Sequence, residues 1–556
     1  MDARPPVVTP APRRDIAAMR SPPGFRGPFR TDATARALYS EGAGIFRIVP
    51  AAVAVPRDLD DLAALVRWAR ESATSLIPRG AGSGMAGGNV GPGVVVDLRR
   101  GFADAPAVDA DARTARAGAG VTYQSLCEAT ARHGLVLPPD PASGKFCTLG
   151  GMAATNAAGP HTLRHGSMRR WVRALEFVTA DGEVGRTGGR ADERTVGHAD
   201  GRTDAEERCA RDVLPEVLRR LPAIETAVPG APKNSSGYDL AGWARSADAA
   251  RLLVGSEGSL CFITAVEVAL APLPGRRSTL LVALRALGDV GPAVLALLPL
   301  GPSALELMDR TYLDFVQASA HRTLPSGTEA VLLVEFEGDG AGAAEAVRGL
   351  ASATERADEV EAASELWELR HLASPILARL PEETRSLQLV EDGCVPVARL
   401  GEYVLALREA ARRHGFRIVV FGHAGDGHLH ANVIADVRAS DLTLRLAACL
   451  DEVTAAQVAL GGTPAGEHGD GRLRAPYLAS VFGEVFAELC RKVKSAWDPA
   501  GIMNPGVVVA QPGGRALDMP LKVGPAAPPI PAAAAEHLRR IEREAGWGTF
   551  LLDLAG

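Results

Sequence analysis

Short apolar runs alternate with amphipathic stretches from residue 48 onward. Residues 48–56 (IVPAAVAVP) and 93–98 (GVVVDL) have the length and composition of buried strands. Between them, residues 58–72 place apolar side chains at helical spacing behind aspartates that can cap a helix. This alternation predicts an α/β arrangement at the start of the chain.

Two β-hairpins and a long amphipathic helix are predicted further along. Residues 172–187 (VRALEFVTADGEVGRT) read as two strands joined by an Asp-Gly turn, and residues 416–437 form a similar pattern around Gly-Asp-Gly. Residues 277–287 and 331–350 each begin with a strand pattern, and residues 444–462 read as an amphipathic helix that ends at two glycines. These patterns predict a second unit of the α+β class.

Prolines that close the apolar stretch before residue 275 indicate a domain boundary there. We expect an N-terminal arm over residues 1–39, a first domain over 40–275, a second α+β domain over 276–506 and a C-terminal tail over 507–556. The arm is rich in Pro and Arg without apolar periodicity, and the tail is rich in Pro and Gly before one short charged helix.

Composition narrows the possible functions. The 556 residues are 47% hydrophobic and 23% charged, which is typical of a globular protein. The formal net charge of −6 does not indicate the excess of positive charge that favours nucleic-acid binding. Seven cysteines without a C-x-x-C pair encode neither a disulfide framework nor an iron–sulfur or zinc-ribbon site. The N-terminal segment lacks the apolar stretch of a secretory signal, and the apolar runs are too short for a membrane span. We therefore expect a cytoplasmic protein, with peripheral membrane attachment left open.

A glycine-rich loop lies at residues 78–91 (PRGAGSGMAGGNVG). Gly82 to Gly87 match G-x-G-x-x-G, but a Rossmann fingerprint requires a helix after the glycines, and here the strand VVVDL follows instead. The pattern predicts a strand–loop–strand element whose backbone amides can surround an anion. A purely structural glycine loop is the alternative.

Small residues also dominate residues 138–168 and 255–259. They remove side chains from a local surface, so backbone amides can lie against a flat ring or a phosphate. Tight packing of helix on sheet is the alternative for one such stretch. Three stretches, in a chain with 60 glycines, indicate one extended ligand such as a large, flat cofactor.

Histidines gather in the second hairpin. His428, His430 and Asn432 share one face of the returning strand, and His423 lies on the other side of the turn. Imidazoles at this spacing can converge on one metal ion. Glu467 and His468, in a glycine-rich loop after the long helix, offer a further ligand and a base, unless they are charges of a surface loop.

Seven motifs occur together in one order: PRGAGSGMAGG, DPASGKFCTLGGMAATNAAG, KNSSGYDL, GSEGSLCFIT, FGHAGDGHLH, GEHGDG and DPAGIMNPG. In this order they resemble the FAD-linked 2-hydroxyacid dehydrogenases, the family of D-lactate dehydrogenase, the glycolate oxidase flavin subunit and D-2-hydroxyglutarate dehydrogenase. The resemblance covers about residues 40–506. It implies an α+β, two-domain flavoprotein of the vanillyl-alcohol-oxidase (PCMH-type FAD-binding) fold with an α+β cap domain. Because the first glycine loop has no histidine, the resemblance implies FAD that is held non-covalently. The implied FAD contacts are Pro78, Arg79, Gly80, Ala81, Gly82, Ser83, Gly84, Met85, Asp140, Ser143, Gly150, Gly151, Asn156, Gly159, Gly255, Gly258, Ile263 and Asn504.

The same resemblance implies a divalent metal, zinc or manganese. Its ligands would be His423, His430 and Glu467, with His428 as a further candidate because the family usually has Asn there. His468 would be the catalytic base, Asn432 would lie near the substrate, and Arg370 would clamp the substrate carboxylate. Without the resemblance, Arg370 reads as a charge on a helix surface. Lys233 and Tyr238 would support the flavin or the substrate.

The implied reaction is oxidation of a D-2-hydroxy acid, D-lactate, glycolate or D-2-hydroxyglutarate, to the 2-oxo acid by metal-assisted hydride transfer to flavin N5. Electrons would then pass to a separate acceptor: a quinone, an electron-transfer flavoprotein, oxygen or an iron–sulfur partner subunit. A homodimer stays open. The alternatives are an enzyme similar to alkyl-glycerone-phosphate synthase, a metal-dependent hydrolase with structural glycine loops, and a non-catalytic FAD-binding subunit.

Overall fold

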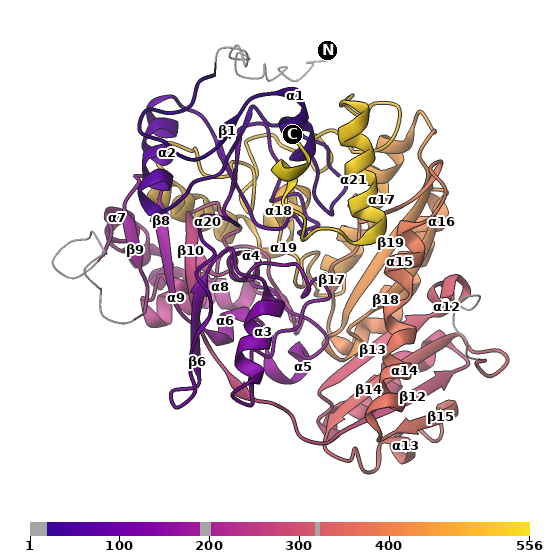
Figure 1. The fold of residues 1–556 in the computed structure, drawn as a ribbon. Helices are drawn as coiled ribbons and strands as arrows, with labels where there is room; N and C mark the ends of the chain where they lie inside the picture. Colours follow the sequence, from indigo (N-terminus) through magenta and orange to yellow (C-terminus); the bar gives the residue numbers. More distant parts are fainter. Residues whose placement is uncertain (1–18, 189–201, 317–322, 556) are drawn as a thin grey trace.

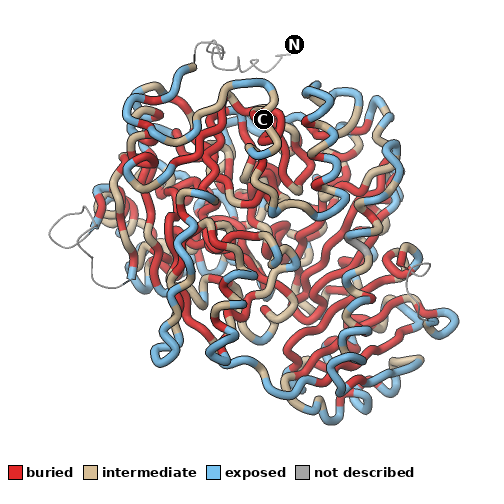
Figure 2. Tube along the Cα trace, in the orientation of Figure 1, coloured by how far each residue is buried: buried red, intermediate tan, exposed pale blue. Residues whose placement is uncertain are grey.

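The computed structural model describes residues 19–188, 202–316 and 323–555; residues 1–18 of the expected arm therefore lie outside the described residues. Figure 1 shows two lobes, one built from the first part of the chain in indigo and magenta and the other from the pink and orange part. Each lobe is organised around its own β-structure, and buried residues follow the sheets of both (Figure 2). The seven cysteines are unpaired, as predicted.

The first lobe begins with a small, mostly parallel sheet in the order β1-β2-β4-β3. Its strands are β1 (Phe29–Arg30), β2 (Ala52–Ala54), β3 (Leu76–Arg79) and β4 (Val94–Asp97). Helices α1 (Ala33–Leu38) and α2 (Leu59–Glu71) accompany it, and Asp58 caps α2 by accepting a hydrogen bond from the Asp61 amide. β3 and β4 pair in parallel, and the glycine-rich loop joins them without an intervening helix, as predicted.

A second, antiparallel sheet follows in the order β5-β6-β10-β8-β9. Its strands are β5 (Ala107–Asp109), β6 (Thr114–Gly118), β8 (Val172–Thr179), β9 (Val184–Arg186) and β10 (Cys261–Ala269), and β7 (Leu135–Val136) pairs with β11 (Ala271–Pro272) beside it. The β8–β9 pair confirms the predicted Asp-Gly hairpin. The helices of this region are α3 (Tyr123–Ala131), α4 (Leu149–Thr155), α5 (Thr162–His165), α6 (Met168–Trp171), α7 (Asp204–Asp212), α8 (Leu214–Ala227), α9 (Leu240–Ser246) and α10 (Ala250–Leu253).

The second lobe is a larger antiparallel sheet in the order β15-β12-β14-β13-β18-β19-β16, with β17 pairing against β19. Its strands are β12 (Arg277–Leu284), β13 (Ala304–Asp309), β14 (Ala330–Glu337), β15 (Ala351–Ala357), β16 (Thr384–Leu387), β17 (Gly393–Cys394), β18 (Arg417–Gly422) and β19 (His428–Asp436). One core contains α11 (Val290–Leu297), α16 (Leu400–Arg413) and α17 (Leu442–Ala459), whereas a second contains α12 (Arg310–Val316), α14 (Val360–His371) and α15 (Ala373–Ala378). The shorter elements are η2 (Leu287–Asp289), η3 (Leu298–Leu300), α13 (Ala343–Ala346), η4 (Val397–Arg399), η5 (Ala424–Asp426), α18 (Gly471–Arg474) and η6 (Ala475–Tyr477).

The chain returns to the first lobe after the second sheet. Helices α19 (Leu478–Phe482) and α20 (Glu484–Trp497) belong to the hydrophobic core of the first lobe. Trp497 is fully buried there, with its ring 5.9 Å from that of Phe177. Residues 502–504 extend this return, because the Leu76 amide donates to the Ile502 carbonyl and the Asn504 amide donates to the Leu76 carbonyl. The return therefore starts well before the MNPG motif, inside the stretch that the sequence assigns to the second domain.

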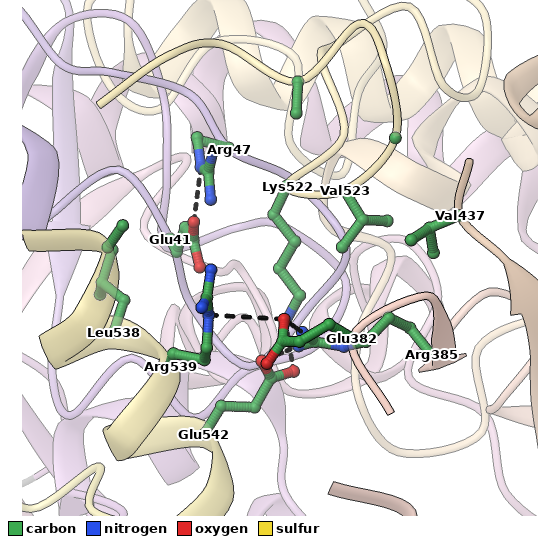
Figure 3. Close-up of a pocket in the computed structure, with 13 residues that line it drawn as sticks. Glu41, Arg47, Glu382, Arg385, Val437, Lys522, Val523, Leu538, Arg539 and Glu542 are labelled. Carbon is green, nitrogen blue, oxygen red and sulfur yellow. Dashed lines mark hydrogen bonds and ion pairs between the residues drawn. The ribbon is translucent and has the colours of Figure 1, made fainter. Parts of the chain in front are cut away.

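The described residues near the two ends of the chain pack together. Helix α21 (Ala532–Glu544) and η7 (Leu551–Leu554) share a small core with α1 and β2, although the sequence assigns them to a tail and α1 to an arm. A cavity of about 230 Å³ lies beside α21, and Lys522 and Arg385 both reach Glu542 there. Figure 3 shows the residues that line it. Apolar residues at helical spacing, Ala534, Leu538 and Ile541, are buried along α21. Among the described helices, none is both long and apolar enough to cross a lipid bilayer.

Candidate active site at the domain interface

The second hairpin brings the predicted histidines together. β18 and β19 pair antiparallel, and Gly427 closes the turn between them with a φ of +67°. Ligand atoms of His423, His428, His430 and Glu467 all lie within 4.8 Å of one another. All four residues are buried, with exposed fractions of 9% or less. Glu467 comes from a loop that is distant in the chain. The tertiary structure therefore forms the cluster that the period-two spacing predicts.

Hydrogen bonds orient two imidazoles toward one point. His430 Nδ1 lies 2.7 Å from the Glu391 carbonyl oxygen, which can only accept, and His423 Nδ1 lies 2.6 Å from Glu306 Oε1. The Glu391 carbonyl therefore fixes the proton of His430 on Nδ1, so Nε2 of that ring presents a lone pair. Burial lowers the pKa of His423, but the Glu306 carboxylate raises it overall, and a bound metal would displace the proton from Nε2 of this ring. The two Nε2 atoms lie 3.3 Å apart, and Glu467 Oε1 lies 3.1 Å from that of His423 and 3.5 Å from that of His430. Three acceptors at such distances fit a cation between them.

Lys233 occupies the other carboxylate oxygen of Glu467. Its Nζ lies 3.0 Å from Glu467 Oε2, 3.2 Å from Asp426 Oδ2 and 3.1 Å from the Gly159 carbonyl oxygen. Burial favours the neutral carboxyl, but the charges of Lys233 and His423 outweigh it and hold the pKa of Glu467 well below its usual range. Glu467 is thus ionised and offers Oε1 alone to the imidazoles.

His428 is held differently from its neighbours. Its Nε2 lies 3.0 Å from Asp392 Oδ1, and its Nδ1 has no hydrogen-bond partner among the described residues, at 3.8 Å from Glu467 Oε2. Burial lowers the pKa of this imidazole, which favours the neutral ring. The buried lone pair of Nδ1 therefore faces the cluster from one side.

His468 stands beside the cluster with a defined orientation. Its Nδ1 lies 2.5 Å from Glu391 Oε2, and its Nε2 lies 3.7 Å from Glu467 Oε1. Its ring stacks on that of His430 with centroids 5.3 Å apart. Burial lowers the pKa of His468, but Glu391 and Asp392 raise it to about 10. A divalent cation beside Nε2 would oppose that protonation.

Arg370 and Asn432 lie next to the same cluster. Arg370 Nε donates to Glu306 Oε2 at 2.8 Å, so Glu306 connects the guanidinium to His423. The guanidinium also lies over the ring of Phe421 at 4.7 Å, beside the strand that carries His423. Asn432 pairs with Val419 two residues beyond His430 on β19 and is buried. The residues predicted as metal ligands, base and carboxylate clamp thus lie close together, and Asn432 is on the strand of His430. Tyr238 lies elsewhere and bonds the hydroxyl group of Ser259.

The glycine loop after β3 surrounds a buried guanidinium. Nε and Nη2 of Arg79 are buried without a hydrogen-bond partner among the described residues. Burial lowers the pKa of Arg79 to about 10, and a Cβ on Gly82 would lie 2.4 Å from Nη2. A buried guanidinium with open donors, in a loop of small residues, fits an anionic group such as the pyrophosphate of FAD. The predicted stretch from Pro78 to Met85 therefore suits that role.

Several other predicted FAD contacts have clear packing roles. A Cβ on Gly80 would lie 2.4 Å from Thr148 Oγ1, and one on Gly150 would lie 2.6 Å from the Cβ of Ala119. Gly159 and Gly258 are equally crowded, against the Asp140 carbonyl and the ring of Pro78. Gly151 and Gly84 have more room, with nearest atoms at 3.1 Å. The tight-packing alternative thus accounts for the absence of a side chain at some of these glycines.

The remaining predicted contacts lie around the same region. Asn504 is fully buried, donates to the carbonyl oxygens of Gly88 and Glu257, and accepts from Arg472. Its amide therefore ties three loops together. The other positions are Ser143 in the turn before α4, Asn156 at the left-handed end of α4, Gly255 against Arg169, and Ile263 opposite Phe177 in β10.

Comparison with known proteins shows which family the chain belongs to. Residues 50–188 match the FAD binding domain family, and residues 273–508 match the family of FAD linked oxidases, C-terminal domain. The chain is 31% identical over 496 residues to D-lactate dehydrogenase of Archaeoglobus fulgidus, which covers 86% of this chain and 95% of that one. The chain belongs to the FAD-linked oxidases. It is an FAD-dependent oxidoreductase, as predicted, and the FAD family match does not support the hydrolase alternative.

Other relatives of this FAD-linked oxidase support the same family. Glycolate oxidase subunit GlcD of Bacillus subtilis is 30% identical over 488 residues, with 86% of this chain and 93% of that one covered. D-2-hydroxyglutarate dehydrogenase of Pseudomonas putida is 30% identical over 515 residues, but this chain spans only 51% of it. Among solved structures, 4-ethylphenol oxidase from Gulosibacter chungangensis has a TM-score of 0.61 at 14% identity, covering 86% and 94%, and alkyldihydroxyacetonephosphate synthase has 0.55 at 15%, covering 90% and 89%. These likenesses confirm the predicted α+β flavoprotein fold of the vanillyl-alcohol-oxidase type.

The motifs of this FAD-linked oxidase do not reveal the groups that hold the site in place. Glu306, Glu391, Asp392 and Arg474 are buried and contact the histidines or their partners. A single Glu within the apolar strand ALELMD was a signal for Glu306, and the acidic pair of VEDG was a signal for Glu391 and Asp392. Arg474 has no such local signal, because basic residues close to a helix end are ordinary.

His161 links the two lobes of the FAD-linked oxidase. Its Nδ1 lies 2.6 Å from Asp140 Oδ2, and its Nε2 lies 2.8 Å from Glu335 Oε1 on β14. Burial lowers the pKa of His161, but these two carboxylates raise it to about 10, from 6.5 for a free imidazole. The charged imidazolium therefore contributes fully to stability below pH 6.5, and its contribution is lost as the pH rises toward 10.

We expect His161→Gln to lower the free energy of unfolding by about 1.5–3 kcal/mol at pH 6. The deficit relative to the parent protein should shrink as the pH approaches 10, because the parent then loses the same charge. Urea unfolding at pH 6, 8 and 9.5 measures both proteins, with His133→Gln on the exposed surface as the control. A deficit that does not change with pH would refute the bridging imidazolium.

Proposed function

We propose that this FAD-linked oxidase oxidises a D-2-hydroxy acid to the corresponding 2-oxo acid with the help of a divalent metal. The observation that carries the proposal is the convergence of His423 Nε2, His430 Nε2 and Glu467 Oε1 beside an oriented His468 and an arginine. The names of the relatives, D-lactate dehydrogenase and glycolate oxidase subunit, support this substrate class. D-Lactate, glycolate and D-2-hydroxyglutarate share a carboxylate next to a carbon that bears a hydroxyl group, and they differ in the rest of the molecule.

His423, His430 and Glu467 would hold the metal, zinc or manganese, with His428 Nδ1 as a further donor. The donor set suits either ion, since imidazole and carboxylate ligands serve both. Glu306 and the Glu391 carbonyl fix the two imidazoles in the tautomer that a metal requires. A bound divalent ion would lower the pKa of the substrate hydroxyl.

Arg370 is suited to the substrate carboxylate. Its bond to Glu306 uses Nε, and its two Nη groups would make a two-pronged contact with a carboxylate. Because Glu306 also bonds His423, the carboxylate and the hydroxyl of one substrate would be placed by the same buried glutamate. Asn432 would contribute an amide on the same side of β19.

His468 is the group that can take the hydroxyl proton. Its Nδ1–H is committed to Glu391, so Nε2 is the atom that accepts. Loss of that proton and of the C2 hydrogen with its electron pair converts the alcohol to the carbonyl group of the 2-oxo acid. FAD, held against the glycine-rich segments, would supply the two-electron acceptor for that hydrogen. We further propose that the electrons then leave to a quinone, an electron-transfer flavoprotein or an iron–sulfur partner subunit.

An anaerobic visible spectrum tests this function. The FAD-loaded protein is mixed separately with D-lactate, glycolate and D-2-hydroxyglutarate, with and without zinc or manganese. Bleaching of the flavin band by one acid, dependent on metal, is expected. A flavin band that none of the acids bleaches would contradict the proposal and favour the adduct-forming alternative.

Glu306→Gln provides a separate test of the metal site. The variant keeps the size of the side chain but removes the carboxylate that bonds His423 Nδ1 and Arg370 Nε. We expect metal affinity to fall about 10- to 100-fold, as for other groups that orient metal ligands. Competition with a chelator measures the affinity, and the exposed Glu345→Gln serves as the matched control. Unchanged affinity would refute the role of Glu306.

A further inference from the structure

A second polar cleft has Lys233 in its wall. It has a volume of about 560 Å³ and lies between residues 156–170 of the first lobe and the turn at Gly425 and Asp426. None of the clustered histidines lines this cleft, and Asn156 is the one predicted FAD contact among its described lining residues. The volume is within the usual range of small-molecule sites.

Cationic side chains dominate the wall of this cleft. Arg169, Arg170, Arg251 and Lys233 line it, whereas Asp426 is the one carboxylate in its described lining. Asp426 is already engaged, because its Oδ2 lies 3.2 Å from Lys233 Nζ. The cleft is therefore positively charged.

The arginines of the cleft have few counter-charges. Asp239 Oδ2 is shared between Arg251 Nη2, at 2.8 Å, and Arg169 Nε, at 3.7 Å. Arg169 Nε is buried and has no hydrogen-bond partner among the described residues. Arg170 is exposed, and its guanidinium has no acidic partner in the part of the chain that the structure describes. Two guanidiniums thus retain unused donors at the same opening.

Burial lowers the pKa of Arg169, which is the direction expected for a guanidinium that lacks a full counter-charge. Guanidinium groups bind oxyanions through paired N–H donors, and several of them together favour an anion with more than one charge.

We propose that this cleft binds a small multivalent oxyanion, of the phosphate or polycarboxylate class, between Arg169, Arg170 and Arg251. The site adjoins the proposed metal and flavin groups, because Lys233 and Asn156 line it, but none of the proposed metal ligands does. An anion held there would be an effector or an additional ligand of the enzyme, and would not be its oxidised substrate.

Calorimetric titration of the FAD-loaded protein tests the proposal. Inorganic phosphate and tricarballylate, which has no hydroxyl group to oxidise, are titrated separately at constant ionic strength. We expect saturable binding of at least one of them. Binding of phosphate alone assigns the phosphate class, and binding of tricarballylate alone assigns the polycarboxylate class.

Arg170→Glu locates the binding. Because Arg170 is exposed, the variant should fold normally, and we expect its affinity to fall at least tenfold. The exposed Arg219→Glu on α8 is the matched control and should bind as the parent does. Failure of both anions to bind the parent would overturn the proposal, as would equal affinity in Arg170→Glu, which would place the anion elsewhere. These outcomes do not depend on which acid bleaches the flavin.

Discussion

Replacing His468 with alanine is expected to lower the rate of flavin reduction by about 100- to 10,000-fold. The imidazole is oriented by Glu391 through Nδ1, and its Nε2 points toward Glu467 Oε1. The other three imidazoles of the described site cannot replace it as the base, because His423 and His430 are proposed metal ligands and His428 Nε2 bonds Asp392. The measurement is stopped-flow absorbance of the flavin band under saturating substrate and metal.

FAD content and metal content should both be retained in His468→Ala, because His468 is not among the proposed ligands. If both contents are retained, a lower rate reflects the loss of the base and not the loss of FAD or metal. His133→Ala, on the exposed surface, is the matched control and should reduce flavin at the parent rate. A fall of less than about tenfold would be too small for general-base catalysis and would reassign the proton acceptor.

Replacing Arg474 with methionine is expected to lower the free energy of unfolding by about 3–5 kcal/mol. Arg474 is almost fully buried, pairs with Glu391, and has Nη1 3.4 Å from Asp392 Oδ2. It also donates to the Gly469 carbonyl oxygen at 2.7 Å. Methionine fills a similar volume but leaves two buried carboxylates without their main counter-charge, which accounts for the size of the loss.

The shift of the urea unfolding transition measures this effect. Arg219→Met on α8 is the control, since its exposed ion pair with Glu216, at 3.6 Å, should contribute little. His468 remains beside Glu391 and Asp392 and can offset part of their charge when protonated. A loss of under about 1 kcal/mol would show that the histidine, and not Arg474, neutralises this pair.

Local patterns in the sequence predicted much of the site. The alternation of His428, His430 and Asn432 placed three side chains on one face of a strand, and the Gly-Asp-Gly turn placed His423 across from them. The absence of a helix after the first glycine loop was also readable, because VVVDL has the pattern of a strand. These features depend on neighbours within a few residues, which is the range over which sequence patterns are informative.

The glycine-rich segments show the limit of that approach. The sequence could not separate glycines that make room for a ligand from those that let two parts of the chain pack closely. Gly80 and Gly150 are crowded by Thr148 and Ala119, whereas Gly151 and Gly84 have more space. Which atoms approach a glycine is decided by segments that are distant in the chain.

The sequence by itself determined the strand–helix alternation of residues 48–98, the hairpin of residues 172–187, the histidine hairpin and the family that the motifs resemble. The tertiary structure alone decided that Glu306 lies against His423, that Glu391 orients His468, and that Lys233 occupies one oxygen of Glu467. It also decided that α20 returns to the first core. The physical reason is that these contacts join residues far apart in the chain. They form only when the packing of whole sheets and helices brings them together and excludes water from the charges.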